Sequence, residues 1–179
     1  MTTRTEIVLS PYETRWATAF EAERAILTQL AGGLFSQIDH IGSTAVPGLP
    51  AKPIIDLQAQ VETLAEPEFY ADLLGPAGYR LVDSDEVDVR VALQKRRDGD
   101  ANVHIVRAGS WAAQRTLLFR DALREDPALA ERYAQLKYEL AATSESMLVY
   151  TLAKTEFVED TLRERCAKLD IAYTPGNRR

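Results

Sequence analysis

A short segment of the chain gathers residue types that suit phosphate chemistry. Residues 40–56 read His-Ile-Gly-Ser-Thr-Ala-Val-Pro-Gly-Leu-Pro-Ala-Lys-Pro-Ile-Ile-Asp. Gly42 lacks a Cβ, so it lets another group approach the backbone closely. Ser43 brings a hydroxyl and an N–H to a phosphate, and Asp56 brings a carboxylate that can hold a divalent cation against it. Together they predict a place where a metal ion and a phosphate meet.

Lys52 lies in the same segment and has two interpretations. Its ammonium can bind the phosphate, or it can pair with Asp56, which is then an ordinary acid at the end of a strand. The prolines and the glycine between residues 44 and 53 shape a loop under either interpretation.

Two strands would position these groups. Residues 37–41 predict one strand, and residues 54–61 predict a second in which Ile55, Leu57 and the next alternate residues form an apolar face. Asp56 and Gln58 then share the opposite face. Two carboxylates at this spacing could share metal ions, but Gln58 offers only a carbonyl oxygen. We therefore expect one metal ion, held weakly and partly by the phosphates of the ligand.

Further strands are predicted at 7–9, at 79–82, at 87–93 and at 102–107, the last two joined by a turn that contains Asp-Gly. His104 would lie within the last of these strands, on the face that it shares with Asn102. It can act as a base for an acceptor group, or it can be a hydrogen-bonded histidine of the sheet.

Helices are expected around this sheet. Ser10 and Glu13 form a capping box for a helix that ends at Gly32, and Pro67 opens a short helix. Ser110 and Asp126 predict the starts of two more, and a last helix is expected from about 146 to 169.

The chain resembles the GrpB family of the nucleotidyltransferase-fold superfamily. The resemblance rests on residues 40–56 and, in the same order, on Asn102-Val-His104-Ile, Phe119-Arg-Asp-Ala-Leu-Arg124, Arg132-Tyr-Ala-Gln-Leu-Lys137 and Tyr150-Thr-Leu-Ala-Lys154. It implies an α+β fold, in which helices flank a mixed β-sheet and a helical part follows. We expect a single domain over 1–179, with the sheet core at about 1–109 and the helical part at about 110–179.

The resemblance also implies functional residues. Members of the superfamily add a third carboxylate from a neighbouring strand, for which Asp88 is the first candidate, although an exposed acidic loop explains Asp88 equally well. Their helices send basic and tyrosine side chains to the triphosphate. The matching positions here are Arg120, Arg124, Tyr133, Lys137 and Lys154. The two arginines can instead join a surface network of ion pairs.

Composition excludes several other classes of protein. The net charge is −6 with a pI near 5.0, so a general nucleic-acid-binding surface is not expected. No apolar run is long enough to cross a membrane, and residues 1–6 do not look like a signal peptide. Cys166 is the one cysteine, so an internal disulfide is excluded and a cytoplasmic location is expected. Oligomeric state leaves no trace in the sequence.

Three functions follow from these expectations. The first is a nucleotidyltransferase that binds ATP or another nucleoside triphosphate with Mg²⁺ and transfers the nucleotidyl group to a small molecule. The second is a ligand-binding or helper domain with a protein partner, related to the GrpB-like unit fused to some dephospho-CoA kinases. The third is an amide ligase that forms an adenylate in the same cleft.

Overall fold

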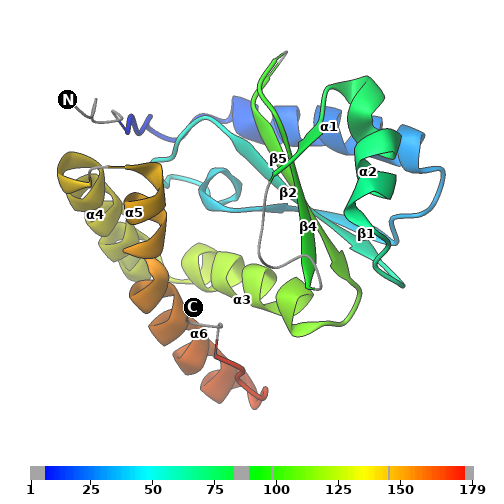
Figure 1. Cartoon of the computed structure of the whole chain (residues 1–179). Coiled ribbons are helices and arrows are strands. Elements are labelled where there is room, and N and C mark those ends of the chain that lie inside the picture. The colour runs from blue at the N-terminus through cyan, green and yellow to red at the C-terminus, as the bar shows by residue number, and fades with distance from the viewer. Residues whose placement is uncertain (1–6, 83–88, 98, 145, 176–179) are drawn as a thin grey trace.

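The computed structural model describes residues 7–82, 89–97, 99–144 and 146–175. Within these residues the fold is α+β and is built on one five-stranded mixed sheet with the order β1-β2-β5-β4-β3 (Figure 1). Only β2 and β5 pair in parallel. The strands are β1 Gln37–Ile41, β2 Ile55–Val61, β3 Arg80–Leu81, β4 Arg90–Lys95 and β5 Ala101–Arg107.

One face of the sheet carries the main hydrophobic core. The alternation predicted for β2 is confirmed, because Ile55, Leu57, Ala59 and Val61 all belong to this core. Two helices, α1 (Arg15–Ala31) and α2 (Pro67–Leu74), cover this face (Figure 1). They bring Trp16, Phe20, Leu27, Tyr70 and Leu74 against the strands.

The other face of the sheet is polar and lies under α3 (Trp111–Glu125). The strand register places Asp39, Gln58 and His104 in one row, and Ile41, Asp56 and Asn102 in the next. Ser110 begins α3 as predicted, because its side chain accepts a hydrogen bond from the backbone N–H of Ala113. This helix links the sheet to the helical part of the chain.

The helical part consists of α4 (Pro127–Thr143), α5 (Met147–Leu152) and α6 (Thr155–Leu169), which stand beside the sheet in Figure 1. A second, smaller core joins it to the loop after β1. Val46 and Leu49 of that loop pack against Leu123 of α3 and Tyr133 of α4. The loop begins with the short 3-10 helix η1 (Ser43–Ala45) and is therefore held between the sheet and the helices. A second such turn, η2 (Gly75–Ala77), follows α2.

Three predictions about local structure need correction. Ser10 does not cap α1, because its backbone pairs with that of Ala51 and the helix begins only at Arg15. Residues 7–9 are not a strand. The last helix is not continuous, because α5 ends at Leu152 and a turn separates it from α6. Among the residues described, every helix is too short or too polar to cross a bilayer.

A buried ionic network lies in the main core. Glu23 of α1 accepts a hydrogen bond from the hydroxyl of Tyr79 at 2.7 Å and also pairs with Lys95 of β4. All three side chains are buried. Loss of either charge would leave the other buried without its partner.

We therefore predict that Glu23→Ala lowers the free energy of unfolding by about 3–5 kcal/mol, as expected for a broken buried ion pair. Urea denaturation measures the change. Glu21→Ala on the same helix is the control, because Glu21 pairs with Arg24 in an exposed position and should change stability by at most about 1 kcal/mol. Equal effects of the two substitutions would show that the buried network contributes nothing beyond a surface ion pair.

Candidate functional site

The Gly42–Ser43 turn and Asp56 lie in direct contact. The register of β1 and β2 pairs Ile41 with Asp56, so the turn begins beside the aspartate. Gly42 has φ 71° and ψ −171°, a conformation that is essentially confined to glycine. A Cβ added at Gly42 would lie 2.4 Å from Oδ2 of Asp56. The carboxylate therefore occupies the space that a side chain at position 42 would need.

Asp56 is oriented by a chain of hydrogen bonds from the neighbouring strands. Nδ2 of Asn102 donates to Oδ1 of Asp56 at 2.7 Å, and Oδ1 of Asn102 accepts from Arg96 at 2.7 Å. Burial raises the pKa of Asp56, while the hydrogen bond from Asn102 and the charges of Lys52, Lys154 and Arg96 oppose the shift. The aspartate thus sits in a positive field that comes from several elements.

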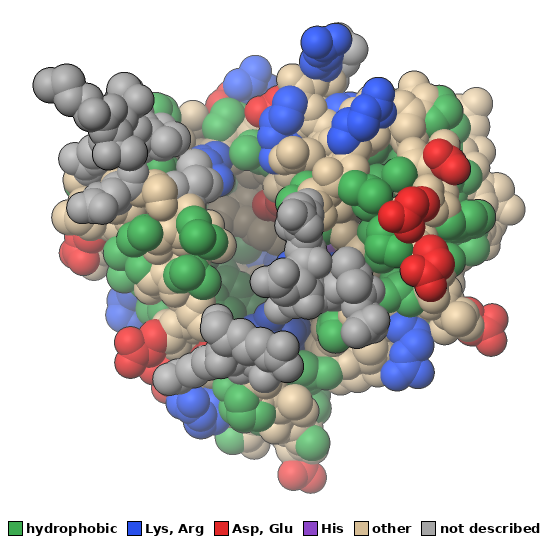
Figure 2. Space-filling view, in the orientation of Figure 1, with side chains coloured by type: hydrophobic (Ala, Val, Ile, Leu, Met, Phe, Trp, Pro, Cys, Tyr) green, Lys and Arg blue, Asp and Glu red, His purple; other side chains and the backbone are tan. Residues whose placement is uncertain are grey.

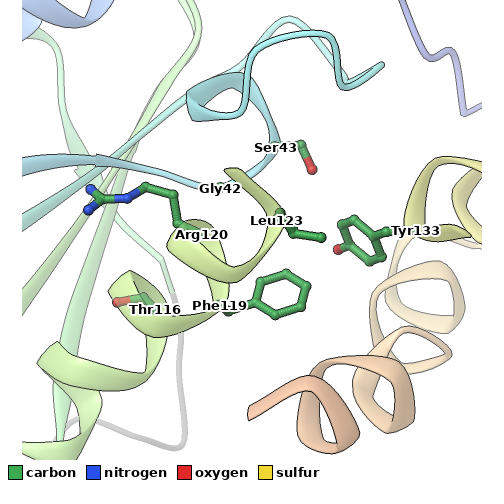
Figure 3. A pocket seen from close by; sticks show the side chains of 7 residues that line it. All are labelled: Gly42, Ser43, Thr116, Phe119, Arg120, Leu123 and Tyr133. Carbon is green, nitrogen blue, oxygen red and sulfur yellow. The ribbon is translucent and has the colours of Figure 1, made fainter. Parts of the chain in front are cut away.

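Ser43 lies beside two residues of α4. The ammonium of Lys137 donates to Oγ of Ser43 at 3.1 Å and to the carbonyl of Pro50. Tyr133 lies one helical turn earlier and lines the same small pocket as Ser43. Figure 3 shows the hydroxyl of Tyr133 and the side chains of Phe119 and Leu123 around a small pocket beside Ser43. The helical part therefore contacts the serine directly.

Two further lysines reach the same region from other segments. Nζ of Lys154, at the start of α6, lies 4.0 Å from the ring centre of Tyr150, and Nζ of Lys52 lies 6.0 Å from it. Burial, followed by the charge of Lys52, lowers the pKa of Lys154 to about 8. Burial, followed by the charge of Lys154, lowers the pKa of Lys137 to about 7. The charge of Lys154 thus acts on Lys137, and the charge of Lys52 acts on Lys154.

The arrangement suits an anion. Ser43 supplies a hydroxyl, Lys137 and Lys154 supply positive charge, and Asp56 supplies one carboxylate at the edge of the group. Figure 2 shows that the molecular surface is hollowed between the helical part on the left and the sheet on the right. We call this set of residues the lysine site: Gly42, Ser43, Lys52, Asp56, Tyr133, Lys137, Tyr150 and Lys154.

Arg120 and Arg124, predicted to bind phosphate, contact the backbone around the Gly42–Ser43 turn. The guanidinium of Arg120 donates to the carbonyl of His40 at 3.0 Å and pairs with Asp121. Two donors of Arg124 bind the carbonyl of Ala45, at 2.9 and 2.7 Å. In Figure 3 the side chain of Arg120 points away from Ser43 and Tyr133. The two arginines therefore hold the backbone on either side of the Gly42–Ser43 turn.

Gln58 was predicted to offer its carbonyl oxygen to the ligand, and the structure assigns that oxygen to α3. Its amide donates to the carbonyl of Ala113 at 3.0 Å, and its oxygen accepts from the hydroxyl of Thr116. The side chain is fully buried. Because both polar ends are engaged, Gln58 anchors α3 to the sheet.

His104 is poorly suited to the predicted role of base. It pairs in register with Gln58, one row along the sheet from Asp56. Burial, and then the charge of Arg90, lowers its pKa to about 3, so its imidazole has little affinity for a proton near neutral pH. Nδ1 of His104 is buried and has no hydrogen-bond partner among the residues described.

The donors near Asp56 do not fit a resident site for two metal ions. The position two residues on is Gln58, and the neighbouring residue on β5 is Asn102, so neither supplies charge. Asp88, the predicted third acid, lies outside the described residues. In the part of the chain that is described, no three acidic, histidine or cysteine side chains gather as metal ligands would.

Comparison with known proteins decides the family. The model of the family described as GrpB protein matches residues 6–164. The chain belongs to the GrpB family. A UPF0157 protein of Halalkalibacterium halodurans is 34% identical over 160 residues, which are 88% of this chain and 81% of that protein. The crystal structure of GrpB from Enterococcus faecalis matches with a TM-score of 0.81 and 32% identity, over 90% of this chain and 99% of that one.

More distant matches show the wider fold. The Cid1 poly(U) polymerase, in a structure with Mg and 3′-dATP bound, has a TM-score of 0.51 at 14% identity, over 81% of this chain and 49% of that one. The fold of this GrpB chain is thus nucleotidyltransferase-like. A dephospho-CoA kinase of Mycolicibacterium paratuberculosis is 30% identical over 89% of this chain, which corresponds to 46% of that protein.

Sequence reasoning missed two residues of the site. Asn102 was placed on the correct face of its strand, but its contact with Asp56 depends on β5 pairing in parallel with β2. Tyr150 was noted only as part of a motif. Its spacing of four residues from Lys154 was a signal for a shared face only within the continuous helix predicted there, because α5 ends at Leu152 and a turn precedes α6.

The contact between Gly42 and Asp56 leads to a prediction. We expect Gly42→Ala to lower stability more than Gly32→Ala, although both glycines have positive φ, because only Gly42 has a side chain in the way. Gly32→Ala should cost about 1–2 kcal/mol, the usual penalty for a left-handed residue. Gly42→Ala should exceed this value by at least about 1 kcal/mol. Thermal unfolding measures both, and equal losses would show that Asp56 moves aside freely.

Proposed function

We propose that this GrpB protein binds a nucleoside triphosphate, with ATP as the expected one, at the lysine site and transfers its nucleotidyl group to a small acceptor molecule. The observation that carries the proposal is the convergence of Ser43, Asp56 and lysines from separate segments on one partly buried region. The nucleotidyltransferase-like fold supports it, because Cid1, which shares that fold, has been seen with Mg and 3′-dATP.

Each residue has a role in this proposal. The hydroxyl and N–H of Ser43 hold phosphate oxygens, and the ammonium of Lys137 fixes the serine while adding positive charge. Lys154 and Lys52 neutralise the remaining phosphate charge. Asp56 lies against Gly42, where it can orient the acceptor or hold the one metal ion that a Mg²⁺–nucleotide complex would bring.

A second candidate function is ligand binding without transfer. It is favoured by Gln58, which fills the place of a second carboxylate and is fully engaged with α3. The match to a dephospho-CoA kinase suggests a helper unit for a partner protein in that case. An amide ligase that forms an adenylate would use the same nucleotide site, and its product would identify it.

Transfer is tested by measuring pyrophosphate release from ATP with Mg²⁺ in the presence of amines, alcohols and amino acids. We expect release in wild type, and a loss of at least about 100-fold in Asp56→Asn, since carboxylates of this kind contribute effects of that order. Asp72→Asn is the control, because Asp72 is an exposed acid on α2.

The outcomes separate the candidates. Binding of ATP without pyrophosphate release, for any acceptor, would favour the ligand-binding function. Release of pyrophosphate with an acceptor that ends as an amide, accompanied by AMP, would identify the ligase. Failure of ATP to bind with or without Mg²⁺, measured by calorimetry, would rule out the proposed function.

The lysines also predict how binding depends on pH. In the free site the pKa of Lys137 is about 7 and that of Lys154 is about 8. A bound anion favours the charged form, so binding takes up protons and the affinity falls as pH rises from 7.5 to 9, when ATP itself no longer titrates. The fall should reach up to about tenfold per pH unit for each lysine that must gain a proton.

Calorimetry in two buffers of different ionisation enthalpy counts these protons. Wild type should take up protons at pH 8, and Lys154→Gln should take up fewer. An affinity that stays constant across this range would mean that both lysines are already charged in the free protein.

A further inference from the structure

We propose that the lysine site binds the polyphosphate chain of its ligand without a divalent cation, with the ammonium groups of Lys137 and Lys154 in place of metal ions. The inference depends on the proposed nucleotide site but on neither of the two reactions considered for it. It concerns the positive charge that neutralises the phosphates. In related folds, this charge is expected to come largely from metal ions held by carboxylates.

The first argument is that the site has few carboxylate oxygens free to bind a metal ion. Oδ1 of Asp56 accepts a hydrogen bond from Asn102, and Oδ2 lies against the backbone of Gly42. The oxygen of Gln58 is taken by Thr116. Among the described residues, Asp56 is therefore a lone and partly occupied carboxylate, whereas a firmly bound Mg²⁺ needs several oxygen ligands.

The second argument is that positive charge is present in excess. Lys137 is only 2% exposed, and its partners are a hydroxyl and a carbonyl, neither of which carries charge. Within the described chain, neither Lys137 nor Lys154 has a carboxylate at ion-pair distance. The charge of Asp56 offsets the burial of Lys154 only in part, so taking these ammonium groups out of water costs free energy that a bound anion would return.

The third argument is the separation of the lysines along the chain. Lys137 belongs to α4 and is fixed to the turn, while Lys154 begins α6 and rests over the ring of Tyr150. Their pKa values are lowered chiefly by burial and secondarily by neighbouring lysine charge, and at Lys154 the charge of Asp56 opposes the shift without cancelling it. Several linked phosphates would meet both groups, so we expect tripolyphosphate to bind more tightly than pyrophosphate, and pyrophosphate more tightly than phosphate.

The test is calorimetry with inorganic tripolyphosphate and with ATP, each in EDTA and in Mg²⁺, using the full chain. For wild type we expect dissociation constants in EDTA within about threefold of those in Mg²⁺. Lys154→Gln should weaken binding in EDTA by at least about tenfold, the value of a lost charge-assisted hydrogen bond. Lys168→Gln is the matched control, because Lys168 is exposed at the other end of α6.

A second variant guards against loss of folding. Lys137→Met keeps the length of the buried side chain and removes its charge; with an unchanged thermal unfolding profile it should also weaken tripolyphosphate binding. A requirement for Mg²⁺ in wild type, or an unchanged affinity in Lys154→Gln, would overturn the inference. Binding of ATP only with Mg²⁺ would leave the proposed function intact, whereas binding of tripolyphosphate but not of ATP would refute the function and keep the inference.

Discussion

The structure of the site depends on one close contact, between the backbone of Gly42 and the carboxylate of Asp56. It sets the turn after β1 against the second residue of β2, and a Cβ at position 42 would be incompatible with it. Ser43 follows the glycine directly, so its direction depends on the same contact. Lys137 then binds Ser43 and Pro50 and thereby ties α4 to both ends of the loop. The sheet and the helical part are thus joined at the residues that would meet a ligand.

Four basic residues near the turn divide into two pairs by what they contact. Arg120 and Arg124 lie on α3 and donate to the carbonyls of His40 and Ala45, so they act on the conformation of the turn. Lys137 and Lys154 come from α4 and the start of α6, and they contact the hydroxyl of Ser43 and the ring of Tyr150 respectively. The rigid, planar guanidinium of arginine suits backbone acceptors that stay in place. The ammonium of lysine sits on a flexible stem and can donate to partners that change when a ligand binds.

The sequence predicts the sheet well and the assignment of polar side chains poorly. Alternation in β2 identified its buried face, because the alternation depends on local geometry. Asp56 lies against Gly42, the residue before Ser43, because β1 and β2 pair at that point. The hydrogen-bond partners of Gln58 and Arg120 depend on which side of α3 faces the sheet. Residue spacing along the helix does not determine that side. The break between α5 and α6 was missed because the sequence there has no glycine or proline to mark it.

The position of Lys154 has a consequence for the balance between stability and affinity. It is the N-cap residue of α6, where the helix dipole is positive and where proteins usually place an acid or a hydroxyl. A cation at that position opposes the dipole and makes the empty protein less stable than a neutral cap would. In the proposed function, the bound anion would offset this unfavourable helix start. Ligand binding would then also stabilise α6.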